Sequence, residues 1–114
     1  MLSTFQREAL TRARGFIASP DHWTTGYFAT DANGHNVPAN DRRAVRFCIR
    51  GAISLALQQM GAWSWKPNGW TEGQVSRAFE KAAGLKVRTI ATWNNCNDHA
   101  TVLLKLDGVL ARAA

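Results

Sequence analysis

"DRRAVRFCIRGAISLALQQM", residues 41–60, is the stretch of sequence that decides the fold. Its apolar residues recur at the spacing of one buried helix face. They are Val45, Cys48, Ile49, Ala52, Ile53, Ala56, Leu57 and Met60. Asn40 or Asp41 can cap the start of such a helix, and Gly61 can end it. We therefore predict a central core helix over residues 41–60, in which Gly51 lets another element approach closely.

A second helix is predicted at the amino terminus. Ser3, followed three residues later by Gln6, has the pattern of a capping box. The apolar residues that follow recur at helical spacing as far as Ala18, and Pro20 disfavours helix beyond it. This segment is amphipathic and lacks the apolar core of a secretory signal.

Two more helices are predicted in the second half of the chain. Thr71, with a glutamine three residues on, can cap a helix that ends at Gly84. The last helix should start at Asn97 or Asp98. Between these two helices, the β-branched residues of 86–93 predict an extended segment or a single turn.

The segment that precedes the central helix predicts a small hairpin. Residues 25–30 read "TGYFAT", a short aromatic strand, and 35–37 can return antiparallel to it. Asn33 and Gly34 can adopt the backbone angles of a tight turn. Pro38 confines the returning strand to an edge or a short bridge.

Length and composition predict one globular domain over residues 1–114. The chain is 46% hydrophobic and 19% charged, which is ordinary for a folded protein. We predict a mostly α (α+β) fold, with about four helices around the central core helix and one small β-hairpin. No apolar run approaches the ~20 residues of a membrane span. Two cysteines do not make a disulfide framework, so we expect free thiols and a cytoplasmic protein.

Two segments, residues 21–56 and 90–110, resemble the bacterial and phage family DUF6197. The family pattern combines Trp-x-x-Gly, Asp-x-x-Gly, Phe/Trp-Cys-x-x-Gly-Ala and Trp-Asn-Asp. The matching residues are Trp23, Gly26, Asp31, Gly34, Phe47, Cys48, Gly51, Ala52, Trp93 and Asn94. Asn95 stands where the family pattern has Asp, so a role for that carboxylate does not carry over. The family has no assigned activity, and the resemblance implies a shared fold without a specific function.

Catalytic and metal-binding chemistry is sparse in this sequence. Cys48 with a histidine could form a thiol–imidazole pair, but it lies on the apolar face of the predicted helix, where we expect core packing. Cys96 and His99 have the spacing of two metal ligands, yet no second pair accompanies them. We expect no catalytic residue, no metal and no cofactor, and we lean against an enzyme.

The polar segment "WNNCNDHAT", residues 93–101, has two interpretations. Part of it should cap the last helix, and its asparagines either tie neighbouring backbone segments together or line a cleft that binds a ligand. The candidate cleft residues are Trp23, Asp31, His35, Trp93, Asn94, Asn95, Asp98 and His99.

A turn-rich loop gathers Trp63, Trp65 and Trp70. Such tryptophans either cover a small core or present a recognition surface to a partner. Both interpretations stay open at the level of the sequence.

An excess of positive charge predicts an anionic partner. The chain has 14 Lys and Arg against 8 Asp and Glu, a formal net charge of +6. On a helix, Arg42, Arg46 and Arg50 would project within roughly 80° of one another, with Arg43 beside them. This basic ridge is either a solvated flank or a contact for phosphates or an acidic protein.

The preferred hypothesis is a small non-catalytic binding protein that engages an anionic macromolecule, either nucleic acid or an acidic or nucleoprotein complex. By analogy it would be an accessory protein of a phage or mobile element, of the counter-defence or regulatory kind. We expect no membrane partner. The alternative is a small enzyme or ligand-binding protein that uses the Asn/Asp/His-rich cleft near residues 93–99.

Overall fold

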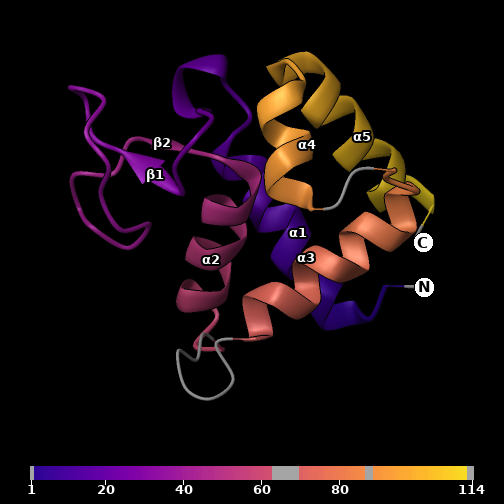
Figure 1. Ribbon diagram of the computed structural model, residues 1–114. Coiled ribbons are helices and arrows are strands. Elements are labelled where there is room, and N and C mark those ends of the chain that lie inside the picture. Colours follow the sequence, from indigo (N-terminus) through magenta and orange to yellow (C-terminus); the bar gives the residue numbers. More distant parts are fainter. Residues whose placement is uncertain (1, 63–69, 87–88, 113–114) are drawn as a thin grey trace.

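The computed structural model describes residues 2–62, 70–86 and 89–112 (Figure 1). The described residues form five α-helices, one 3-10 helix and two short strands. In chain order these are α1 (Thr4–Phe16), η1 (Pro20–His22), β1 (Ala29–Thr30), β2 (Arg46–Phe47), α2 (Ile49–Gln59), α3 (Trp70–Ala83), α4 (Ile90–Cys96) and α5 (His99–Arg112). The predicted mostly α fold with a small antiparallel sheet is confirmed. None of these helices is both long and apolar enough to cross a membrane.

The first helix begins as its sequence predicts. The Ser3 hydroxyl accepts a hydrogen bond from the Gln6 backbone N–H, and the Gln6 side chain accepts one from the Ser3 N–H. This capping box satisfies two amides that would otherwise lack partners at the helix start. The helix ends at Phe16, and Ile17 forms its carboxy-terminal cap. Both boundaries lie within two residues of the predicted ones.

The central helix is shorter than predicted, because residues 41–48 are not part of it. Helix α2 starts at Ile49, and its N-cap is Cys48 rather than Asn40 or Asp41. The preceding backbone pairs with another segment instead: Val45 N–H donates to the Thr30 carbonyl, and Cys48 N–H donates to the Phe28 carbonyl. Long-range pairing here outweighs the local helical pattern.

The small sheet takes its second strand from an unexpected place. β1 pairs antiparallel with β2, in the register Ala29–Phe47 and Thr30–Arg46. The predicted hairpin partner lies on the other side of β1, where Asn36 forms a single bridge with Thr30. The hairpin is therefore present as a turn and one bridge, while β2 supplies the longer pairing.

Thr71 lies inside helix α3 and does not cap it, because the helix already begins at Trp70. Gly84 follows its last turn with φ +65°, as predicted for a terminating glycine. The last helix also begins as predicted, since the Asp98 carboxylate accepts a 2.8 Å hydrogen bond from the Thr101 N–H.

The prediction of an extended segment or single turn before the last helix is wrong, because residues 90–96 form α4. The Thr89 hydroxyl accepts a hydrogen bond from the Thr92 N–H. The Glu80 carboxylate on α3 accepts a second hydrogen bond, of 2.6 Å, from the Ile90 N–H. Two capped amides at its start compensate for the low helix propensity of β-branched residues.

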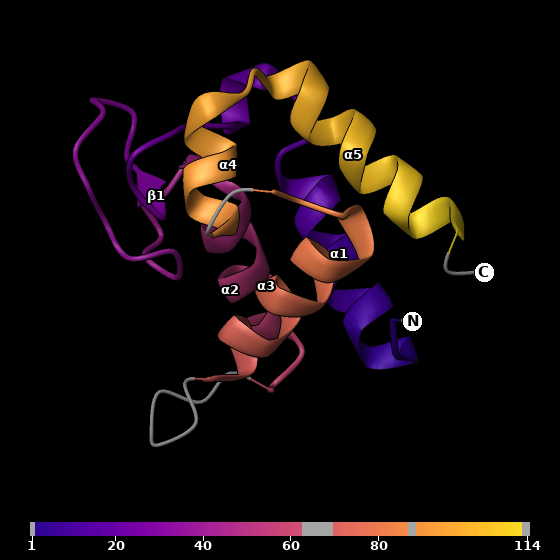
Figure 2. The same ribbon diagram turned by 45° about the vertical axis from the view of Figure 1, so that its right-hand side comes forward.

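Helix α2 is the centre of the core, as predicted. It packs against α1, α3 and α4, while α5 packs against α1 and α3 (Figure 2). Fully buried side chains meet from all these helices, among them Leu10, Ile53, Leu57, Phe79 and Leu106. Residues 23–48, with the small sheet, lie on one side of the helices (Figure 1).

Gly51 provides the close approach that its position predicts. A Cβ atom at this residue would lie 1.8 Å from the Phe28 carbonyl oxygen. Backbone occupies the space that a side chain would need, so the segment around Phe28 rests directly on the first turn of α2.

We expect Gly51→Ala to lower the free energy of unfolding by about 3 kcal/mol, because the Phe28 backbone must move away. Gly108→Ala is the matched control, since Gly108 is also helical and a Cβ there meets nothing within 4 Å. That control should be stabilised by about 0.5–1 kcal/mol. Urea unfolding of the two variants checks both values, and equal stability would contradict the close packing.

Candidate functional site

The polar segment before the last helix serves as a structural tie. Asn94 is fully buried, and its Oδ1 accepts hydrogen bonds from the Trp23 indole (2.9 Å) and the Ile49 N–H (3.2 Å). Its Nδ2 donates to the Thr24 carbonyl at 3.1 Å. One side chain on α4 thus holds the start of α2 and the segment at 23–24.

The neighbours of Asn94 extend this tie. The Asn95 Oδ1 accepts a 3.0 Å hydrogen bond from the Gly26 N–H. Trp93 is buried against the Phe79 ring, with centroids 5.8 Å apart. The Trp23 ring lies 5.7 Å from the ring of His99, whose Nε2 is 2.6 Å from the Ile17 carbonyl oxygen.

Asp31 and His35 lie in the turn after β1, away from α4. Asp31 Oδ1 accepts hydrogen bonds from the N–H groups of Asn33 and His35, both at 2.9 Å. The bond from His35 is the main reason that the pKa of Asp31 is lowered. The pKa of Asp98 is also lowered, by hydrogen bonds from Thr101. These carboxylates therefore stabilise local backbone, and the binding role of the eight cleft candidates stays a prediction.

The four arginines of the predicted ridge do not lie on one helix, because only Arg50 is within α2. Arg43 forms a 2.9 Å ion pair with Asp41 and, through its side-chain hydrogen bonds, lowers the pKa of that carboxyl to about 2. Arg46 donates from Nη1 to the Asp31 carbonyl. Arg42 is exposed and bonds to no other described residue. Their predicted role in binding stays a prediction.

Arg50 makes a partly buried ion pair that the sequence did not reveal. Its guanidinium contacts the Glu72 carboxylate of α3 at 2.6 and 3.0 Å, and the Ser76 hydroxyl donates to the same carboxylate. The guanidinium also lies 4.8 Å from the centre of the Phe28 ring. The partners are 22 residues apart in sequence, and no periodic pattern connects them. Breaking such a pair leaves a charge unpaired away from water.

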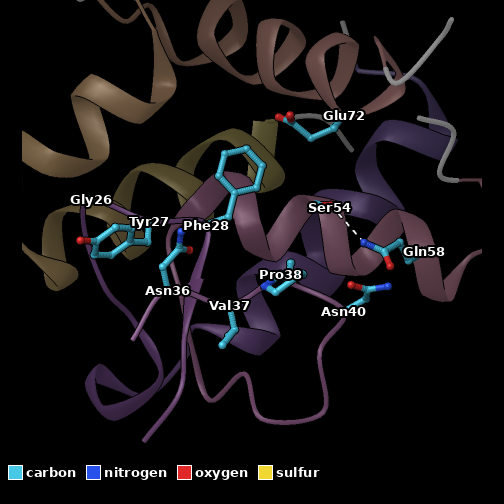
Figure 3. A pocket seen from close by; sticks show the side chains of 11 residues that line it. Gly26, Tyr27, Phe28, Asn36, Val37, Pro38, Asn40, Ser54, Gln58 and Glu72 are labelled. Carbon is cyan, nitrogen blue, oxygen red and sulfur yellow. Dashed lines mark hydrogen bonds between the residues drawn. The ribbon is translucent and has the colours of Figure 1, made fainter. Parts of the chain in front are cut away.

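A large hollow lies between the 26–40 segment and α2 (Figure 3). We call it the amide hollow, and its volume is about 750 Å³. Its lining consists of Gly26, Tyr27, Phe28, Asn36, Val37, Pro38, Ala39, Asn40, Ser54, Gln58 and Glu72. None of the eight cleft candidates is among them. The sequence pattern did not indicate this hollow, because its amides come from two separate segments, residues 36–40 and α2.

A second, smaller hollow borders the first. We call it the arginine hollow, and its volume is about 390 Å³. It is lined by Thr24, Thr25, Tyr27, Thr30, Ala32, Asn33, Gly34 and Arg46. Tyr27 lines both hollows, and its side chain is half exposed.

The two cysteines differ in their surroundings. Cys48 is buried, as predicted, but as the N-cap of α2 instead of a residue inside the helix. Burial raises the pKa of its thiol, which opposes nucleophilic chemistry. Cys96 is exposed. Within the described ranges, no group of three or more His, Cys, Asp or Glu residues could hold a metal ion.

The side chains of the three tryptophans in the predicted recognition loop lie outside what the structure describes. Trp63 and Trp65 lie outside the described residues, and so does the side chain of Trp70, the first residue of α3. Their role in recognition stays a prediction.

Asn94→Asp provides a test of the structural tie. An ionised carboxylate would face the Thr24 carbonyl, so the folded state should favour the protonated acid and raise its pKa above the ordinary value of about 3.9. Compared with the unchanged protein, the free energy of unfolding of this variant should therefore fall as pH rises from about 4 to 7. Asn95→Asp, at an exposed position, should show a much smaller loss. Urea unfolding across this pH range checks both, and a pH-independent difference for Asn94→Asp would contradict the proposed contacts.

Thiol labelling tests the burial of Cys48. In the native protein Cys96 should react first and Cys48 only upon unfolding, as counted by mass spectrometry with a thiol reagent. Cys96→Ser should remove the fast reaction. Cys48→Ala should lower stability by about 1 kcal/mol, because it removes a small buried group. Rapid native labelling of Cys96→Ser would show that Cys48 is accessible.

Comparisons with known proteins give one result. No curated protein and no solved structure matches the chain. A family model, described as a family of unknown function (DUF6197), matches residues 2–112. This match covers both segments that carry the resemblance in the sequence. The chain belongs to the DUF6197 family.

Proposed function

We propose that this is a small, cytoplasmic, non-catalytic binding protein that engages an anionic macromolecule. The observation that carries the proposal is how the acidic side chains are used. Within the described residues all of them except Asp21 accept a hydrogen bond or ion pair from the chain itself. Basic side chains with no such partner remain at the surface: Arg42, Arg77, Lys81, Lys86 and Lys105. The outward field is therefore positive, which favours association with anions.

The lining of the amide hollow supports binding over catalysis. Tyr27 and Glu72 are its ionisable residues, and the Glu72 carboxylate is bound by Arg50 and Ser76. General acid–base catalysis needs a proton donor or acceptor that is free to exchange with the substrate. The hollow instead offers amides and hydroxyls, which recognise a ligand without reacting with it.

The proposal includes an accessory role in a phage or other mobile element, of the counter-defence or regulatory kind. Small size and a strong positive charge support this role by analogy with other proteins of that kind. The partner would be nucleic acid, a nucleoprotein or an acidic protein complex.

A double variant, Arg42→Gln with Arg43→Gln, tests where the anion binds. Both side chains are exposed, so unfolding should change by about 0.5 kcal/mol or less for each. The control is Lys81→Gln with Lys105→Gln, which lowers the net charge equally at distant positions. Both variants should weaken binding to a DNA duplex. The arginine variant should weaken it more, because Arg42 and Arg43 are adjacent and exposed and can contact neighbouring phosphates even though Arg43 also pairs with Asp41. For the arginine variant, a plot of the logarithm of the binding constant against the logarithm of the salt concentration should be less steep, by about 0.9 for each lost phosphate contact.

Affinity capture from host lysate, with and without nuclease, separates the kinds of partner. Loss of capture upon nuclease treatment indicates nucleic acid, and capture that survives nuclease but is weakened in the arginine variant indicates an acidic protein. Capture that neither variant alters would overturn the proposed anionic partner.

A further inference from the structure

The side chain of Tyr27 separates two hollows with different chemistry. On one side lie the amides of Asn36, Asn40 and Gln58, in the amide hollow (Figure 3). On the other side lie the Arg46 guanidinium and several threonines, in the arginine hollow. A half-exposed aromatic ring thus stands between groups that recognise neutral polar edges and a group that attracts anions.

The backbone on both sides of Tyr27 is held in place. Gly26 N–H donates to Asn95 Oδ1, and the Phe28 carbonyl accepts from Cys48 N–H directly over Gly51. The ring therefore projects from a fixed backbone and has only its own two side-chain torsions to order upon binding. Low ordering entropy makes such a ring a favourable stacking platform.

The charges in the two hollows differ in sign. Glu72 lines the amide hollow, and its carboxylate disfavours a phosphate there even though Arg50 pairs with it. The Arg46 side chain donates from Nη1 to the Asp31 carbonyl, which is its one side-chain hydrogen bond within the described residues. A ligand that fits both hollows therefore has a neutral, planar, hydrogen-bonding part next to an anionic part.

We propose that the two hollows together bind single-stranded nucleic acid. A base stacks on Tyr27 and turns its edge toward Asn36, which lies beside Tyr27 in Figure 3. Asn40 and Gln58 lie farther along the hollow and can meet the edge of a second base. The adjoining phosphate lies on the other side of Tyr27, against Arg46. Amides both donate and accept, so they suit base edges, and stacking tolerates every base.

This proposal rests on the proposed function and specifies its partner. A duplex keeps its bases paired and stacked, so its bases cannot reach the Tyr27 ring without being extruded. The protein should therefore prefer a single strand to a duplex of equal length. An acidic protein remains the competing occupant, and the experiment distinguishes it.

The test measures fluorescence anisotropy with a labelled oligonucleotide of roughly 15 nucleotides at about 50 mM salt, single-stranded or annealed. Tyr27→Ala should weaken single-strand binding by about 5- to 100-fold, which corresponds to the loss of one stacked base. Tyr27→Phe keeps the ring and should bind like the unchanged protein. Phe5→Ala is the matched control, because Phe5 is a similarly exposed aromatic on α1 and should have no effect.

Arg46 tests the second hollow. Arg46→Gln should lower the log–log salt slope for the single strand by about 0.7, the value for one lost contact, whereas Arg46→Lys should keep most of it. Circular dichroism and urea unfolding of each variant establish that the binding is compared between folded proteins.

Two results would overturn this proposal. In the first, the duplex binds as tightly as the single strand, or Tyr27→Ala binds like Phe5→Ala. If the Arg42/Arg43 variant still weakens nucleic acid binding in that case, the anionic partner stands and only the single-strand site fails. In the second, no oligonucleotide binds, but nuclease-resistant protein capture is lost in Tyr27→Ala. The hollows would then dock an acidic protein instead.

Discussion

The buried side chain of Asn94 is the interaction on which the rest of the structure depends. Its amide bonds to Trp23, Thr24 and Ile49, and so connects α4 to the start of α2 and to the segment that leads into the sheet. A buried amide without these partners would cost its full desolvation, so the three segments must meet there together. The contact of Phe28 with Gly51 then fixes how closely the sheet segment rests on α2.

These constraints give the candidate binding surface its rigidity. Tyr27 lies between Gly26, bound by Asn95, and Phe28, held against Gly51. Asn94 and Asn95, two of the cleft candidates, therefore support the segment that carries this half-exposed ring. The asparagines of α4 hold this segment in place, and its exposed groups are the ones that the proposed ligand would contact.

Part of the candidate site follows from the sequence and part does not. The positive charge, the free thiols and the polar nature of the segment at 93–101 are all visible in the residues. The two hollows are not, because their walls come from separate segments whose side chains meet only in the fold. The ion pair of Arg50 could not be predicted for the same reason. In the sequence Arg50 looks like an exposed cation, yet in the fold it pairs with the buried carboxylate of Glu72.

Elements decided by local contacts were determined by the sequence itself. The capping box at Ser3, the stop at Gly84 and the Asp98 cap each involve groups within four residues, so their patterns are readable without the fold. Residues 41–48 have a helical pattern too, yet only the tertiary structure decided their conformation. The backbone of residues 45–48 pairs with residues 28–30, and these long-range hydrogen bonds outweigh a helix propensity of a few tenths of a kcal/mol per residue.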